Sequence, residues 1–126
     1  MYYSNFIKKS DAVDDINASN RAVVAGGTQG IGAGIALRFA LAGASVWVIG
    51  RSEERGAEIV KKLEQASQEG ARRRQRAADG EKPDFDFLRA DLSDVDEIKR
   101  VAEVVKQKAG SRGIDWLFET QGEYNS

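Results

Sequence analysis

The sequence predicts an α/β fold in which a parallel sheet of about four strands carries helices on both faces. Apolar runs that suit strands alternate along the chain with stretches of helical periodicity. One of these runs, residues 45–49, is nearly continuous, as in a strand covered on both faces. A glycine-rich turn joins the first apolar run to the first helical stretch. Strands that alternate with helices in this way form parallel sheets through right-handed crossovers.

Length and composition exclude several classes of function. The 126 residues suffice for one domain or for part of a larger one. With 19 basic and 20 acidic residues, there is no net charge that would favour nucleic acid or an anionic membrane as a partner. The sequence has no cysteine and no histidine, so a metal site is not expected. No stretch approaches the length of a membrane span, and a cytoplasmic location is expected.

The predicted elements follow one another in a regular order. Residues 1–20 form a polar leader, expected to be loosely ordered, and residues 21–126 form the folded part. Strands are expected over 22–25, 45–49, 85–88 and 114–118, and helices over 31–41, 53–68 and 95–109. Residues 69–83 are interpreted as a polar, basic connection, and their run of arginines as a solvated insertion rather than a nucleic-acid site.

Helix ends and helix faces are also predicted from local pattern. Gly43 suits the C-terminal end of the first helix, and Ser52 suits the N-cap of the second. Ser93, followed three residues later by Asp96, resembles a capping box for the third helix. The spacing of apolar residues predicts a buried stripe on two helices. In the first helix the stripe is Ile31, Ile35 and Phe39, and in the third it is Val95, Ile98, Val101 and Val105.

The glycine turn predicts an anion-binding site. Gly26, Gly30 and Gly32 stand where a strand gives way to a helix. Backbone N–H groups at a helix start lack intrahelical partners, and the helix dipole adds partial positive charge there. Glycines leave these groups open to a phosphate. The spacing is G-x-x-x-G-x-G, which is neither the G-x-G-x-x-G fingerprint nor a P-loop. The alternative is that the glycines only make tight turns.

With these landmarks, the sequence resembles the short-chain dehydrogenase/reductase family over roughly residues 21–122. The first turn of that family reads T-G-x-x-x-G-I-G, which this chain matches except that Ala25 replaces the threonine. Gly50-Arg51 ends the second strand, Asp91-Leu92-Ser93 follows the third, and Gly122 follows the fourth. The resemblance implies an incomplete, doubly wound Rossmann-like domain with the strand order 3-2-1-4.

The resemblance further implies a dinucleotide cofactor. An acidic residue after the second strand would bind the ribose 2′-hydroxyl of NAD, whereas Arg51 suits the 2′-phosphate of NADP. NADP is therefore expected and NAD is less favoured. Asp91 would contact the adenine edge and Leu92 would pack beside the ring, although Asp91 could simply begin a turn. The expected cofactor-binding residues are Gly26, Thr28, Gln29, Gly30, Ile31, Gly32, Arg51, Ser52, Asp91, Leu92 and Gly122.

The sequence departs from the family pattern in its last part. The family commonly has N-A-G after the fourth strand, where this chain has Thr120-Gln121-Gly122. The family's catalytic Ser and Tyr-x-x-x-Lys would lie beyond residue 126, and Tyr124 does not substitute for that tyrosine. No catalytic residue is therefore expected here. The interpretation is the cofactor-binding portion of an NADP-dependent oxidoreductase, truncated or a fragment, that does not turn over a carbonyl or alcohol substrate alone.

Two alternatives belong to other functional classes. The chain could be a non-catalytic module that binds NADP(H) or dimerises through an exposed fourth strand. It could instead be a methyltransferase-like domain that binds S-adenosylmethionine, but such sites favour an acidic residue where Arg51 stands. Competition between NADPH and S-adenosylmethionine distinguishes these ligands. The substrate of a complete enzyme is beyond what the sequence predicts.

Overall fold

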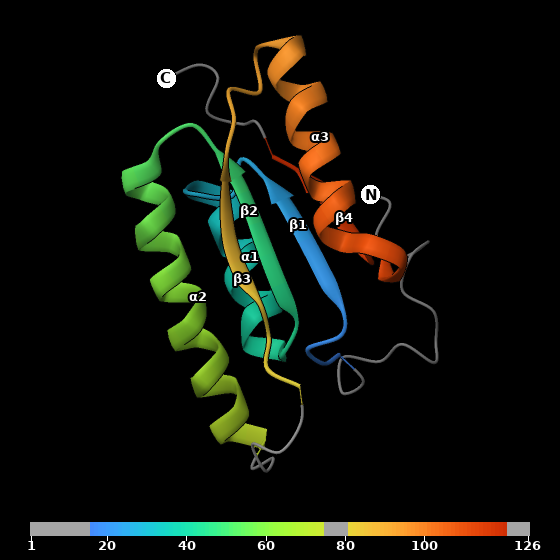
Figure 1. The fold of residues 1–126 in the computed structure, drawn as a ribbon. Helices are drawn as coiled ribbons and strands as arrows, with labels where there is room; N and C mark the ends of the chain where they lie inside the picture. Colours follow the sequence, from blue (N-terminus) through green and yellow to red (C-terminus); the bar gives the residue numbers. More distant parts are fainter. Residues whose placement is uncertain (1–15, 75–80, 121–126) are drawn as a thin grey trace.

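Four parallel strands form one sheet, and each crossover between them contains a helix (Figure 1). The computed structural model describes residues 16–74 and 81–120. The strands are β1 (Arg21–Ala25), β2 (Ser45–Gly50), β3 (Phe85–Arg89) and β4 (Trp116–Glu119), and they lie in the order β3-β2-β1-β4. The helices are α1 (Gly30–Ala42), α2 (Glu53–Arg74) and α3 (Val95–Ala109), with a short 3₁₀ turn η3 (Gly110–Arg112). The predicted fold class and strand order are confirmed.

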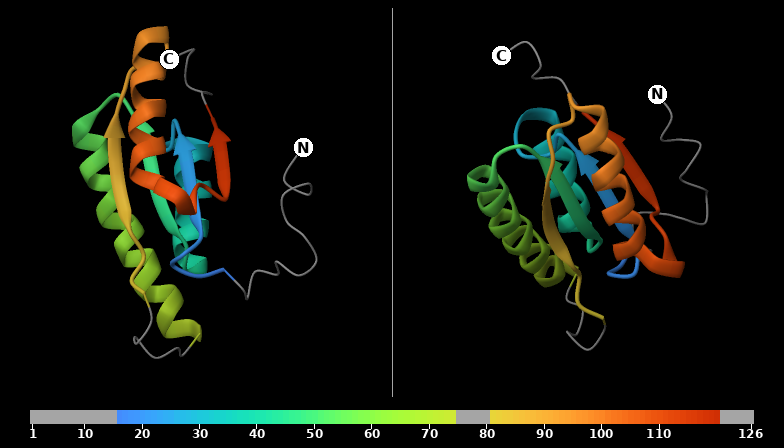
Figure 2. Two further views of the ribbon diagram at one scale, coloured as in Figure 1. Left: turned by 45° about the vertical axis from the view of Figure 1, so that its right-hand side comes forward. Right: turned by 45° about the horizontal axis from the view of Figure 1, so that its top comes forward.

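The sheet is covered on both faces, with α1 and α2 on one side and α3 on the other (Figures 1 and 2). Alternate side chains of the central strands therefore enter two separate cores. Val24 and Val48 belong to the core under α1 and α2, whereas Val23 and Trp47 belong to the core under α3. All six residues of β2 are buried, which explains its nearly continuous apolar sequence.

The first helix uses only part of its predicted apolar stripe. Of the three expected residues, Ile35 and Phe39 pack against the core under α1 and α2, but Ile31 is 78% exposed. The fully buried positions are instead Ala36 and Ala40. Small side chains allow α1 to lie close to both the sheet and α2, so the larger residues are displaced to the rim. In α3 the prediction is also partly wrong, because Val95 is 63% exposed while Val101 is buried.

The second helix is longer than predicted, so the expected connection over 69–83 is wrong in its first part. Glu69 forms ion pairs with Arg72 and Arg73 on the same helix. The Arg74 guanidinium donates to the Leu41 carbonyl oxygen at 2.7 Å and so satisfies the C-terminal end of α1. Arg72 and Arg73 are therefore exposed residues of α2, and Arg74 joins α2 to α1; Gln75 and Arg76 lie outside the described residues.

The caps of the helices are confirmed in two cases and corrected in one. Gly43 has φ +111° and its N–H donates to the Ala40 carbonyl oxygen. The Ser52 hydroxyl oxygen accepts from the Arg55 amide at 3.2 Å. The N-cap of α3, however, is Asp94 rather than Ser93, since the Asp94 carboxylate accepts from the Asp96 and Glu97 amides. The Ser93 hydroxyl instead donates to Asp91 at 2.7 Å.

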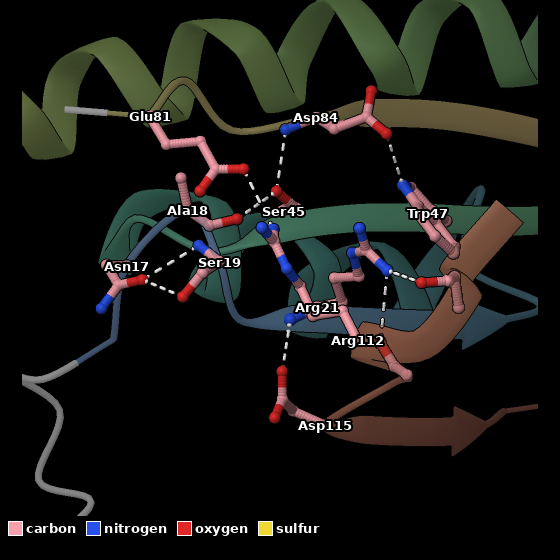
Figure 3. A network of polar contacts seen from close by, with 12 residues as sticks. Asn17, Ala18, Ser19, Arg21, Ser45, Trp47, Glu81, Asp84, Arg112 and Asp115 are labelled. Carbon is pink, nitrogen blue, oxygen red and sulfur yellow. Dashed lines mark hydrogen bonds and ion pairs between the residues drawn. The ribbon is translucent and has the colours of Figure 1, made fainter.

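A polar network ties the amino ends of the strands together (Figure 3). The Trp47 indole N–H donates to Asp84 at 3.0 Å, and the Asp84 amide donates to the Ser45 hydroxyl oxygen at 2.8 Å. The Arg21 amide donates to Asp115 at 2.8 Å, which joins β1 to the residue before β4. These bonds fix the amino edge of the sheet and leave the carboxyl edge for a site. None of the helices in the described ranges has the length and apolarity that a membrane span requires.

Candidate functional site

The predicted site residues meet at the carboxyl edge of the sheet. Because all four strands are parallel, the segments that follow them lie along this one edge. The register pairs Ala25 with both Ile49 and Glu119, and Gly50 with Arg89. The glycine turn, the turn at Arg51 and the turn at Asp91 are therefore neighbours although they are far apart in the sequence. Gly122 falls outside the described residues.

Close packing explains why the glycine turn needs its glycines. Gly26 has φ +80°, and its amide donates to the Ile49 carbonyl oxygen at 2.8 Å. A Cβ on Gly32 would lie 2.3 Å from the Gly26 carbonyl oxygen and 2.4 Å from Thr120 Oγ1. A side chain at either position would push the turn away from β1 and β4. The turn is thus held tightly beneath the start of α1.

The start of α1 is open where a ligand would approach. Gly30 has φ +62°, and a Cβ built there meets no atom within 4 Å. Gln29 occupies the N-cap position without a side-chain capping bond, and the first turn of the helix contains no acidic residue. The free N–H groups and the positive end of the helix dipole are therefore not neutralised by a side chain of the described residues. This arrangement fits a phosphate.

Thr28 connects the glycine turn to the end of β2. A Cβ at Gly50 would lie only 2.9 Å from Thr28 Cγ2, so the threonine packs directly on that glycine. The next residue, Arg51, is exposed, and the half-buried Ser52 begins α2. The start of α1 and Arg51 therefore lie on the same edge of the sheet.

The turn after β3 presents an ionised carboxylate. The Ser93 hydroxyl donates to Asp91 Oδ1 at 2.7 Å and the Ser93 amide donates to the same oxygen at 3.0 Å. These two bonds hold the pKa of Asp91 below its usual range, with smaller contributions from the positive charges of Arg51 and Arg89. Arg89 was not singled out from the sequence; the available signal was its place at the end of a predicted strand.

Two further contacts brace this turn. The Asp91 amide lies 3.4 Å from Glu97 Oε1, and the Arg100 guanidinium donates to Glu97 and to the Arg89 carbonyl oxygen. The hydrogen bonds from the Arg100 guanidinium and the Asp91 amide lower the pKa of Glu97, which keeps the Glu97 carboxylate ionised. Leu92 packs against the core beneath α3, which places its side chain below this edge rather than in solvent.

Comparison with known families agrees with this geometry. The family model described as short chain dehydrogenase matches residues 20–125, which is most of the chain. The match includes the glycine turn, the end of β2 and the turn after β3. The chain belongs to the short-chain dehydrogenase family.

Individual relatives are longer than this chain. This chain is 34% identical to the 3beta-hydroxysteroid dehydrogenase of Mediterraneibacter gnavus over 92 residues. The aligned region covers 73% of this chain and 28% of that protein. A Pseudomonas aeruginosa RhlG/NADP active-site complex superposes with a TM-score of 0.64 at 25% identity, covering 86% of this chain and 37% of that one. An NADH-dependent reductase A1-R′ complexed with NAD superposes with a TM-score of 0.63 at 25% identity. The match covers 85% of this chain and 37% of that one. The chain thus spans about a third of the length of the relatives it matches.

Proposed function

We propose that this chain binds NADP(H) and is the cofactor-binding part of an oxidoreductase that acts on carbonyl or alcohol groups. The single observation that carries the proposal is the glycine turn. There Gly32 has no room for a side chain, while Gly30 faces open space at an uncapped helix start. When bound, the nicotinamide would supply or accept a hydride at its C4 position. The residues of this chain bind and orient the dinucleotide.

The glycine turn would hold the pyrophosphate. Amide groups from Thr28 to Gly32 lie at the start of α1, where the dipole favours negative charge. Thr28 and Gln29 are half-buried in this turn, and Ile31 is exposed beside it. The exposed Ile31 side chain offers an apolar surface to the ligand. Gly122, after β4, would complete this part of the site.

Arg51 and Ser52 would hold the ribose 2′-phosphate. Arg51 is exposed and forms no ion pair or side-chain hydrogen bond with a described residue, so its guanidinium is available for a charge-assisted bond. The Ser52 hydroxyl oxygen already accepts from the Arg55 amide, which leaves its hydrogen free to donate to a phosphate oxygen. Both interactions require the 2′-phosphate that distinguishes NADP from NAD.

Asp91 and Leu92 would hold the adenine. The Asp91 carboxylate accepts two hydrogen bonds from Ser93 through one oxygen, so its other oxygen can accept from an exocyclic amine. Leu92 lies at the edge of the core under α3 and offers an apolar contact to the ring. Because Asp91 stays ionised at neutral pH, it acts only as an acceptor there.

The proposal assigns binding, and not turnover, to these 126 residues. They contain no Tyr-x-x-x-Lys, so no tyrosine and lysine are paired to exchange the substrate proton. We therefore expect the chain alone to bind the cofactor without reducing a carbonyl compound. The alternative, a binding or dimerisation module, draws its support from β4, which forms one edge of the described sheet with Leu117 71% exposed.

Fluorescence titration with NADPH and NADH tests the proposed function. We expect the wild-type chain to bind NADPH more tightly, and Arg51→Gln to weaken NADPH binding by about tenfold while leaving NADH binding unchanged, since a charge-assisted bond to phosphate is lost. Arg38→Gln is the matched control, because Arg38 is an exposed arginine of α1 beside Phe39 and Trp116. Failure of the wild-type chain to bind either nucleotide, or displacement of NADPH by S-adenosylmethionine, would contradict the proposal.

A further inference from the structure

The arginines of the described residues divide into two groups. One group binds a carboxylate or a backbone carbonyl oxygen: Arg21, Arg72, Arg73, Arg74, Arg100 and Arg112. The other group has neither an ion pair nor a side-chain hydrogen bond within the described parts of the chain: Arg38, Arg51, Arg55 and Arg89. Three members of the second group lie where β2 and β3 end and α2 begins. A guanidinium without a partner is available to an anion.

Register places Arg89 beside the Arg51 turn. Arg89 is the partner of Gly50 in the parallel pairing of β2 and β3, so their Cα atoms are about 4.8 Å apart. The Ala90 amide donates to the Gly50 carbonyl oxygen at 2.8 Å, which extends the pairing by one residue. Arg51 directly follows Gly50. The two arginines therefore come from adjacent strands at the same level of the sheet.

The alternation of β3 puts Arg89 on the face that α2 covers. Phe87 belongs to the core under α1 and α2, whereas Leu88 packs into the core under α3, so Arg89 shares the face of Phe87. Gly56, in the first turns of α2, lies on the Phe87 ring, since a Cβ there would be 2.3 Å from it. Arg89 is two residues nearer the carboxyl edge, at the level where α2 begins.

The same position is close to the glycine turn. Gly50 carries no side chain, and the space that its Cβ would take is approached by Thr28. The register partner of Arg89 on β2 is Gly50, which has no side chain. The Thr28 side chain, from the glycine turn, packs on that glycine. Arg89 is exposed and is the last residue of β3, at the edge where the proposed 2′-phosphate site lies.

The negative charges at the start of α2 explain why a second arginine would be needed to bind a phosphate. Glu53 and Glu54 occupy the first turn of α2, immediately after Arg51. Their carboxylates stabilise the helix start but oppose the approach of a dianionic phosphate. A second cation from β3 offsets that repulsion. The positive charges of Arg51 and Arg89 both act on Asp91 and lower its pKa, which agrees with both arginines lying near this turn.

We propose that Arg89 is a second guanidinium for the 2′-phosphate and helps to determine the preference for NADP over NAD. The proposal rests on the function proposed above. It extends the phosphate site from the turn after β2 to the end of β3. The phosphate would then lie between guanidinium groups from two neighbouring strands, with the Ser52 hydroxyl at the start of α2.

Isothermal titration with two adenosine nucleotides tests this inference. Adenosine 2′,5′-bisphosphate carries the 2′-phosphate, and adenosine 5′-monophosphate does not. We expect Arg89→Gln to weaken bisphosphate binding by about five- to tenfold and to leave monophosphate binding unchanged, because a charged hydrogen bond to phosphate is removed. Arg89→Lys keeps the charge and should retain more of the affinity. Arg38→Gln is the control, since it removes an exposed, unpartnered arginine elsewhere.

The outcomes separate this inference from the proposed function. If the wild-type chain binds neither nucleotide nor NADPH, the proposed function fails and this inference fails with it. If the wild type binds NADPH but Arg89→Gln binds the bisphosphate as tightly, the function stands and the role of Arg89 is wrong. Equal weakening of both nucleotides would also overturn it. Circular dichroism of each variant shows whether the fold is retained, and Arg89→Lys decides the matter if Arg89→Gln does not fold.

Discussion

The Thr120 hydroxyl lies 3.1 Å from the Gly26 carbonyl oxygen, so the residue after β4 holds the turn after β1. The same hydroxyl is 3.0 Å from the Ala25 carbonyl oxygen. Gly32 lies against both groups, because a Cβ there would clash with the Thr120 hydroxyl and with the Gly26 carbonyl. The shape of the proposed pyrophosphate site therefore depends on a residue almost a hundred positions along the chain.

Replacement of Gly32 by alanine should disrupt this contact. The new Cβ would lie 2.3 Å from the Gly26 carbonyl oxygen, so the turn must move away from β4. We expect the free energy of unfolding to fall by about 2 kcal/mol or more, with loss of NADPH binding. Gly34→Ala is the matched control, because nothing lies within 4 Å of a Cβ there. It should gain about 0.5–1 kcal/mol from helix propensity. Urea unfolding checks both, and an unaffected Gly32→Ala variant would refute the packing argument.

Removal of the Arg74 side chain should loosen the contact between α1 and α2. Its guanidinium donates to the Leu41 carbonyl oxygen, which has no helical partner at the end of α1. We expect Arg74→Ala to lower the free energy of unfolding by about 1–2 kcal/mol. The neighbouring Arg73→Ala removes only an exposed ion pair with Glu69 and should cost less than about 0.5 kcal/mol. Equal effects in urea unfolding would show that the contact with α1 is unimportant.

The stability of the turn after β3 should depend on pH through Asp91. Its pKa in the folded chain is below the usual value, chiefly because the Ser93 hydroxyl and amide donate to it. The stabilisation is therefore complete above the unfolded-state pKa and is lost as the pH falls through the folded-state pKa. We expect Ser93→Ala to raise the pKa of Asp91 toward its usual value, as measured by NMR titration of the carboxyl group. The stability difference between wild type and Ser93→Ala should shrink below that pH; a constant difference would be inconsistent with this linkage.

We propose that the 126-residue chain is marginally stable alone or associates through β4. This strand forms one edge of the described sheet, and open apolar grooves of about 530 and 510 Å³ flank it on the α1 and α3 sides. The Phe39 ring lies tilted against the Trp116 ring at a centroid distance of 4.9 Å, so the α1 groove is rich in aromatic surface. We expect Leu117→Lys, which places a charge on the exposed edge, to reduce association in analytical ultracentrifugation. A monomeric wild type with a sharp thermal transition at high temperature would contradict the proposal.

The predictions that succeeded from sequence depend on local pattern. The continuous apolar run at residues 45–49 predicts a doubly covered strand, and the left-handed conformation of Gly43 follows from its place after a helix. Those that failed depended on contacts that hydrophobic period and residue spacing do not specify. Ser93 was a reasonable cap by spacing, but the carboxylate of the neighbouring Asp94 accepts from the first amides of α3 instead. The length of α2 was underestimated because the stabilising contact of Arg74 is with α1.

The sequence by itself determined the order of strands and helices, the glycine turn, and the presence of an arginine after β2, because hydrophobic period and glycine spacing are properties of neighbouring residues. Only the tertiary structure decided that Ala36 and Ala40, rather than Ile31, face the core, and that Arg89 lies beside the Arg51 turn. For α1 the physical reason is its close packing on the sheet and on α2, which only small side chains allow. For Arg89 it is strand register, because hydrogen bonding between β2 and β3 sets which residues stand side by side and no local pattern in either strand specifies that alignment.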